Sequence, residues 1–593
     1  MDWNKLFRIL IVTLTTLYVI NIVYARLTKP YSLWPYDGVY MLYPLLALLV
    51  VTALCSHRID SSVVNIVYYI VIPLILLTPV FNTRYSFGKF DVWAHMSYSK
   101  HIIETGFLPD TGVYADLYRS TPLIQVFISE LSLLTGLDTL TVIRLFQALF
   151  IITIIVATKA MVNLLSRYIA PLEHRVDAFL PILLVLFIPD VYGFRGTLAA
   201  LPLFSITLYL IIATIIKKKI QYLATTITLI IAISFMHIPS LAILVAMSII
   251  LLPGIYIAKL FCRRESMFKV IDIRTLSLMS VMLAILLGIH IAYTEPGRGL
   301  ASSLKDLVYR LYTLFVGEPF AVKRAYKRAL ITLDRYTLFY TVYVYIGRYI
   351  LQTMLYMIIA LIIAYMMFIK RDCNRYAIIY MLTIMLLPTY LSFIVFSLMY
   401  NIKVRFLSYI VLFMTTISIY LIDKLYVYRK TSIVLKTLFI VFFILSIPST
   451  FYMQPLVPNY KGHGYLVDFS IDDNPYLIEA YKWVNTQISR DIGLRVSIIL
   501  FPYIDWAIYY YVARDYHDNI AGFVYKDAVK KMDIVRGYTG LKLLIYFYPV
   551  KTFFHSYIYN ITYNRNVLYR DNIVYNNGVA YVVDIETKVQ YIE

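Results

Sequence analysis

The sequence has little cysteine, little charge and few acidic residues. Its 593 residues include three cysteines, Cys55, Cys262 and Cys373, which lie far apart and form no Cys-x-x-Cys pair. Neither a disulfide framework nor a metal knuckle is therefore predicted. Only 15% of the residues are charged, against about 25% in an ordinary soluble domain. The high apolar content, 61%, excludes a disordered or collagen-like chain.

What the chain has instead is a series of long apolar segments. A membrane-spanning helix needs about 20 mostly apolar residues. The first segment follows a basic N-terminus without a clear cleavage site, so it is predicted to be a retained span rather than a removed signal peptide. The predicted spans are 6–25, 39–55, 63–81, 139–158, 178–194, 197–216, 220–238, 239–258, 275–293, 338–368, 376–398, 405–422 and 432–452. The expected fold is a polytopic α-helical membrane protein with about 13 spans.

The positive charge is distributed unevenly between the connecting loops. The chain has 54 Lys and Arg against 34 Asp and Glu, a net charge of +20. Alternate short loops are basic, Lys217 to Lys219 most clearly, and basic short loops face the cytoplasm. The sequence therefore predicts a cytoplasmic N-terminus and an outside C-terminus. Because this topology accounts for most of the surplus, nucleic acid is disfavoured as a partner.

Two domains are expected. Residues 1–453 form a membrane domain with long external loops at 82–138 and 294–337, and residues 454–593 form an extracytoplasmic soluble domain. In this tail the runs VSIIL, LKLLIYFY and VAYVVDI are typical of strands, and PYLIEAYKWVNTQI is typical of a helix. The tail is therefore predicted to be α/β. The 57 tyrosines are attributed to compositional bias and to membrane interfaces, where an apolar ring with a polar hydroxyl is favoured.

The segment GKFDVWAHMSYSKHIIETGFLPD, residues 88–110, is the most informative for chemistry. Asp91 follows the third predicted span, and ionisable residues near a membrane are candidates for function. Asp91 and His95 are four residues apart, so a helix would place them on one face. The carboxylate can deprotonate an acceptor hydroxyl or hold a divalent metal, and the imidazole can orient it or contact a phosphate. The alternative is a helix N-cap at Asp91 and a surface histidine.

This segment resembles the first external loop of the GT-C membrane glycosyltransferases, and in particular that of the archaeal oligosaccharyltransferase catalytic subunit. The matching residues are Asp91, Trp93, His95, Gly106, Leu108, Pro109, Asp110, Tyr118 and Pro122. The resemblance implies that Asp91 is the catalytic or metal-binding carboxylate. The tail departs from that family, because FPYIDWAIY stands where the acceptor-recognising WWDYG motif is expected. The departure indicates an acceptor other than a protein sequon.

A polyprenyl-phosphate donor requires cationic groups at the outer membrane face, where an arginine fork suits phosphate. The candidates are Arg405 at the start of the twelfth predicted span, Arg144 and Arg348 inside spans, and His237 at the outer end of the seventh. Snorkelling arginines and a helix-end histidine are the alternatives. Glu295, in the second external loop, is a possible counterpart of the acid that oligosaccharyltransferases carry there, the alternative being an ordinary loop acid.

These observations predict an inverting glycosyltransferase in the cell membrane. It would move a sugar from a polyprenyl-phosphate donor to a glycan, lipid or protein acceptor on the outer face. Oligosaccharyltransferase-like protein glycosylation and a lipid-linked glycan flippase remain as alternatives. No cofactor is certain: Mg or Mn would be held by Asp91 if the reaction depends on a metal, but no tight acidic pair accompanies it.

Overall fold

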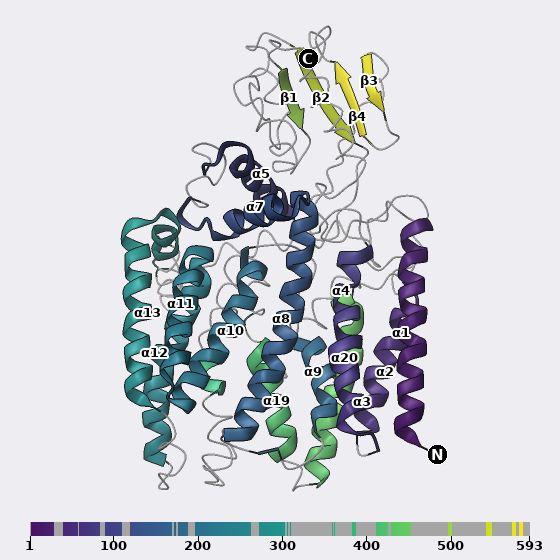
Figure 1. The fold of residues 1–593 in the computed structure, drawn as a ribbon, viewed down its shortest axis with the longest axis vertical. Helices are drawn as coiled ribbons and strands as arrows, with labels where there is room; N and C mark the ends of the chain where they lie inside the picture. The colour runs from purple at the N-terminus through teal and green to yellow at the C-terminus, as the bar shows by residue number, and fades with distance from the viewer. Residues whose placement is uncertain are drawn as a thin grey trace.

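The computed structural model describes most of the first 302 residues and selected segments of the rest. Described are residues 2–302, apart from 29–38, 57, 83–88, 109–118, 169–170, 173–175, 188–195 and 262–271, then 411–424, 429–451, the four strands, and a few single positions between 305 and 409. The structure consists of a bundle of apolar helices, two short helices that cross one end of it, and a small sheet beyond them (Figure 1).

The helices of the bundle follow the apolar runs of the sequence. In chain order they are α1 (Trp3–Thr28), α2 (Leu42–Leu54), the continuous run α3 (Ser61–Ile66), η1 (Val67–Val71) and α4 (Ile72–Asn82), α8 (Thr139–Tyr168), η2 (Asp177–Phe179), α9 (Leu180–Phe187), α10 (Gly196–Lys217), α11 (Ile220–Met236), α12 (Ile238–Phe261), α13 (Ile273–Tyr293), α19 (Val411–Lys424) and α20 (Arg429–Phe451).

Six described helices are long and apolar enough to cross a membrane: Trp3–Thr28, Ser61–Thr78, Thr139–Tyr168, Ala200–Lys217, Ile238–Tyr256 and Ile273–Tyr293. The protein is therefore a multi-pass membrane protein. Shorter apolar helices coincide with further predicted spans, among them α2, α11 and α19. The number of thirteen stays a prediction, because most of 338–368 and 376–398 lies outside the described residues.

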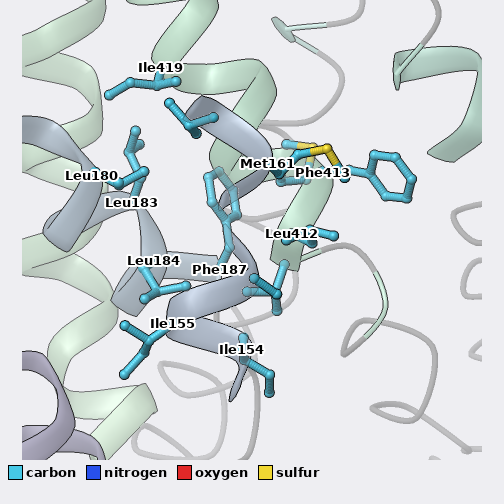
Figure 2. Close-up of a cluster of buried hydrophobic side chains, with 14 of the residues drawn as sticks. Ile154, Ile155, Met161, Leu180, Leu183, Leu184, Phe187, Leu412, Phe413 and Ile419 are labelled. Carbon is cyan, nitrogen blue, oxygen red and sulfur yellow. The ribbon is translucent and has the colours of Figure 1, made fainter. Parts of the chain in front are cut away.

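The centre of the bundle lies where α9 packs between α19 and α20. All eight residues of α9 are buried, and a helix that is apolar on every side belongs in a core. Figure 2 shows its side chains, Phe187 among them, meeting Ile154 and Met161 of α8 and Leu412 of α19. By contrast, α1 is mostly exposed, with apolar residues such as Val12 on its surface. Such an outer face fits lipid rather than water.

Buried tyrosines connect the helices. The hydroxyl of Tyr18 in α1 donates to the carbonyl of Leu74 in α4 at 2.9 Å, and Tyr68 in η1 donates to the carbonyl of Ile155 in α8 at 2.7 Å. The largest fully buried side chains are Tyr18, Tyr68, Tyr98, Tyr409, Tyr420, Phe187 and Phe204. The prediction that tyrosine serves mainly membrane interfaces was therefore incomplete: a phenol can also occupy an apolar core if its hydroxyl has a partner.

The two ends of the bundle differ. The end at which α1 begins is called the lower end, and the opposite end, crossed by α5 (Lys89–Thr105) and α7 (Leu123–Thr135), the upper end (Figure 1). Basic and aromatic residues meet at the lower end. Lys217, the last residue of α10, lies over the ring of Tyr168 and donates to the hydroxyl of Tyr222 at 2.9 Å. Arg58 lies over the ring of Trp3 at 5.2 Å.

The tail contains a mixed four-stranded sheet in the order β1-β2-β4-β3. The strands are β1 (Val496–Leu500), β2 (Leu541–Phe547), β3 (Asn572–Asn576) and β4 (Ala580–Asp584). β1 and β2 are parallel, with Val496 opposite Leu541, whereas β4 runs antiparallel to both β2 and β3. The predicted strands VSIIL, LKLLIYFY and VAYVVDI coincide with β1, β2 and β4, and the structure adds β3. The predicted helix lies outside the described residues, so the α/β class and the domain boundary at 453 stay predictions.

Asp138 fixes the junction between α7 and α8 at the upper end. Its carboxylate accepts the backbone N–H of Thr141 at 3.0 Å and the Thr141 hydroxyl at 2.5 Å, which caps α8. Burial raises the pKa of Asp138, but the Thr141 hydrogen bonds outweigh it and hold the pKa below its ordinary value of 3.8. The carboxyl therefore stabilises the fold in its ionised form.

We expect Asp138→Ala to lower the free energy of unfolding by about 1 kcal/mol, as for a lost N-cap. Because the folded-state pKa is depressed, this contribution is present above pH 3.8 and disappears as the pH falls through the lower folded value. Unfolding of the purified protein in detergent, measured against pH, tests both statements. Asp138→Asn keeps a capping oxygen and should retain most of the stability without the acid dependence. An equal loss in both variants would contradict the capping role.

Candidate functional site

A layer of polar side chains lies between α5 and α7 at the upper end. The two helices pack against one another along their length. Buried in their contact are His95 and Ser99 from α5 and Gln125 and Ser129 from α7, and we call these four residues the α5–α7 polar layer. Buried polar groups are costly unless they are hydrogen-bonded, so their presence in a helix contact requires specific pairing.

The hydrogen bonds of the polar layer run in both directions between the helices. Nε2 of Gln125 lies 3.1 Å from Nδ1 of His95. The Ser99 hydroxyl donates to the backbone carbonyl of Gln125 at 3.2 Å. The Ser129 hydroxyl lies 2.9 Å from the carbonyl of Ser99 and 2.7 Å from the carbonyl of Gln125 in its own helix, and it shares its proton between the two. Which of the two side chains donates in the pair of Gln125 and His95 depends on the tautomer of His95.

Asp91 lies on the same helix as His95, one turn closer to its beginning. α5 covers Lys89–Thr105, so the segment that carries both residues is helical. Residues four apart in a helix share a face, which places Asp91 and His95 on one face of α5. The alternative that Asp91 is an N-cap is wrong, since the residue lies inside α5, and His95 is not a surface histidine, since it is 1% exposed. The side chain of Asp91 lies outside the described part.

A second polar network lies where α11 ends and α12 begins. Only His237 separates these two helices, where the sequence indicated a short loop. Nδ1 of His237 lies 2.8 Å from the Ser240 hydroxyl and accepts the backbone N–H of Ser240 at 3.3 Å. The imidazole therefore caps the first turn of α12, and its Nδ1 is an acceptor. This agrees with the helix-end alternative for His237 and fixes which nitrogen carries the proton.

Tyr409 joins this network from a distant part of the chain. Its hydroxyl lies 2.6 Å from the Ser240 hydroxyl and 3.3 Å from Nδ1 of His237. Its ring, which is buried, meets that of Phe204 in α10 edge to face, with 4.6 Å between the centroids. We call His237, Ser240 and Tyr409 the histidine–tyrosine network. It connects α10, the α11–α12 junction and the residues just before α19.

The histidine–tyrosine network belongs to the upper end. α8 starts beside α7 at the upper end, and its last residue, Tyr168, meets Lys217 at the lower end. α11 begins directly after Lys217 and is 17 residues long, a rise of about 25 Å at 1.5 Å per residue. His237 at its end has therefore returned to the upper end. The α5–α7 polar layer and the histidine–tyrosine network therefore lie at the same end of an otherwise apolar bundle.

The remaining predicted site residues are placed as follows. Arg144 lies half-buried in the second turn of α8, near the upper end as expected. Glu295 is exposed and begins a helical turn, which Thr294 caps with its hydroxyl 3.2 Å from the N–H of Gly297. That environment suits the alternative of an ordinary loop acid. Arg348 and Arg405 lie outside the described residues.

Four buried polar residues near the upper end were not among the candidates that the sequence indicated. They are Gln125, Ser240, Tyr409 and His290. Gln125 was detectable as a polar residue inside the apolar run PLIQVFI, and Ser240 stands in the same short stretch as His237. Tyr409 carried no signal, because its role depends on a contact 169 residues away. His290, buried near the end of α13, meets the ring of Phe235 edge to face.

No metal site emerges from the described side chains: among them, no group of three or more His, Cys, Asp and Glu residues could hold an ion. The side chain of Asp91, the residue proposed to bind Mg or Mn, is not among those compared. The prediction about a metal therefore stays open.

The fold and these two networks define a multi-pass helical membrane protein with polar residues gathered at one end of its bundle. No protein-family model matches the chain, and no curated protein matches it. Two solved structures of ArnT from Cupriavidus metallidurans are similar, one bound to undecaprenyl phosphate and one in the apo state. Each has a TM-score of 0.44 and 10% sequence identity to this chain. Each match covers 88% of this chain, together with 97% of the undecaprenyl phosphate-bound structure and 98% of the apo structure. A likeness this distant assigns neither family nor activity.

We expect Tyr409→Phe to destabilise the upper end. The substitution keeps the ring contact with Phe204 but leaves Ser240 and His237 without the phenol, and losing a buried hydrogen-bond partner costs about 1–3 kcal/mol. Thermal unfolding in detergent measures the change. Tyr293→Phe is the matched control, because Tyr293 is 81% exposed and should give no shift. Equal melting midpoints for wild type and Tyr409→Phe would show that the Tyr409 hydroxyl does not contribute to stability.

Proposed function

We propose that this protein is an inverting glycosyltransferase whose donor is a sugar on a polyprenyl phosphate. The observation that carries the proposal is the concentration of polar residues at the upper end, beside an apolar bundle. α5, with Asp91 and His95 on one face, crosses the end at which the histidine–tyrosine network also lies (Figure 1). A lipid-linked donor needs this combination, because its chain requires an apolar surface and its phosphate and sugar require polar groups.

Asp91 is proposed as the carboxylate that acts on the acceptor. It removes the proton of the acceptor hydroxyl, and the resulting oxygen attacks the anomeric carbon from the face opposite the phosphate. The new bond joins acceptor oxygen and anomeric carbon, the bond from that carbon to the phosphate oxygen breaks, and polyprenyl phosphate leaves with the electron pair. One displacement inverts the configuration. The support is the place of Asp91 in the first turns of α5, on a helix outside the apolar bundle.

The donor phosphate is proposed to meet cations at the upper end. For Arg405 and Arg348 the only support is their position in the sequence. Arg144, which is half-buried in α8, is a further candidate. Tyr409, four residues after Arg405 in the sequence, contacts Ser240 and His237. In the neutral ring the proton of His237 stands on Nε2, a donor that suits a phosphate oxygen. Glu295 is kept as a candidate with the weakest support, since it is exposed at a helix start.

The sidedness of the reaction follows from the topology. Lys217 and Arg58 lie at the lower end together with the N-terminus, and basic short loops favour the cytoplasm. We therefore propose that the upper end, the candidate site and the tail with its sheet face outward. We propose that the tail contacts the glycan, lipid or protein acceptor.

Asp91→Asn should abolish transfer, with a loss of at least about a hundredfold, the usual contribution of a general base. The assay uses membranes that contain the expressed full chain and a panel of polyprenyl-phosphate sugars labelled in the sugar. Glu104→Gln is the matched control, because Glu104 is an exposed acid of the same helix that pairs with Lys100 at 3.7 Å. Wild-type transfer that persists in Asp91→Asn would remove Asp91 from the mechanism, and labelled lipid that crosses the membrane without any product would indicate a flippase.

A further inference from the structure

The buried side of α7 carries both apolar and polar residues. They are Ile124, Gln125, Ile128, Ser129 and Ser132, whereas Phe127 and Leu134 are 48% and 79% exposed. Apolar burial is non-directional, so it does not by itself fix the position of one helix along the other. The hydrogen-bonded residues Gln125 and Ser129 supply the directional part of the contact with α5.

Hydrogen bonds of this kind determine the register of two helices. On α5, His95 and Ser99 are one turn apart, and on α7 the same spacing separates Gln125 and Ser129. Each turn of one helix is bonded to the other, through His95–Gln125, Ser99–Gln125 and Ser129–Ser99. A slip of α5 along α7 would break these bonds. The Ser129 hydroxyl would keep its 2.7 Å contact with the carbonyl of Gln125 in its own helix, but Nε2 of Gln125 and the Ser99 hydroxyl would lose their partners across the contact. That loss makes a slip more costly than one between smooth apolar surfaces.

His95 is enclosed by this contact. The residue is 1% exposed, so its ring lies within the protein. Its hydrogen bond to Gln125 fixes the ring orientation through Nδ1. Asp91 stands one turn before it on the same face of α5. A group that fixes the turn following a reactive carboxylate controls where that carboxylate stands without touching the substrate.

We propose that His95 and Gln125 form a positioning clamp that holds α5 on α7 and thereby sets the place of Asp91. This inference rests on the proposed function and deepens it: His95, which the sequence indicated as a catalytic partner of Asp91, acts through the helix contact. Gln125 becomes a positioning residue of the same site. Misplacing a reacting group by about 1 Å can cost about a hundredfold in rate, so the clamp is worth as much to transfer as a direct contact.

A swap of the two side chains separates positioning from chemistry. His95→Gln and Gln125→His each break the pair, whereas the double variant restores an amide opposite an imidazole with their helices exchanged. The variants are expressed as full chains and assayed in membranes with the labelled polyprenyl-phosphate sugars. Gln125→Leu removes the amide, and Gln147→Leu, the same change at another buried glutamine in α8, is the matched control.

We expect Gln125→Leu and both single variants to lower kcat about tenfold to a hundredfold, with KM for the donor unchanged, because the lipid site is untouched. The double variant should recover most of the lost kcat, and Gln147→Leu should behave as wild type. A double variant that folds with the wild-type melting midpoint but stays as inactive as His95→Gln would overturn the clamp, since it would show that an imidazole at position 95 is itself required.

Thermal unfolding of the same variants provides a readout that does not depend on activity. The two single substitutions should each lower the melting midpoint, and the double variant should melt closer to wild type than the sum of the two shifts, as expected for residues in contact. Additive shifts would overturn the clamp. If wild type transfers no sugar from any donor of the panel, the proposed function fails, whereas the coupling between His95 and Gln125 is still decided by melting.

Discussion

A polar group inside an apolar helix bundle must find its hydrogen-bond partner within the protein, because lipid offers none. The arrangement of this protein depends on that constraint. Tyr18 and Tyr68 donate their hydroxyls to backbone carbonyls of neighbouring helices, so each bond ties a side chain to one position on another helix. Dispersion contacts such as those around Phe187 fill the core (Figure 2), but they tolerate sliding. Directional bonds fix the register, and the upper-end site inherits its geometry from them.

The same constraint explains why the candidate site lies at one end. The histidine–tyrosine network and the α5–α7 polar layer both lie near the upper end, where a helix ends or lies across the bundle. Helix ends leave backbone groups unpaired, and His237 meets that need by capping α12. A site built from such ends combines an apolar surface for a lipid chain with polar groups for a phosphate and a sugar. The proposed glycosyl transfer uses both.

Much of the bundle was predictable because each span is a local apolar run. Predicted and described segments agree closely at 220–238, 239–258 and 275–293, which match α11, α12 and α13, whereas α8 begins at the predicted residue 139 but continues ten residues beyond 158. The strands of the tail were predictable for the same reason. The roles of tyrosine were not, since composition indicated interfaces while burial showed hydroxyls directed at carbonyls. The spacing of His95 and Asp91 correctly predicted that they share one face of a helix. The burial of His95 could not be predicted, because it depends on packing against α7, which no local sequence pattern reveals.

The sequence by itself determined that this chain is a helical membrane protein, where most of its helices run and which residues could carry charge to a phosphate. These properties depend on composition and on spacing within one helix. Only the tertiary structure decided that Gln125 holds His95, that Tyr409 reaches Ser240, and that both groups of residues share the upper end. Such pairings join residues up to 172 positions apart, and their energies depend on burial and on direction, which exist only once the helices have packed.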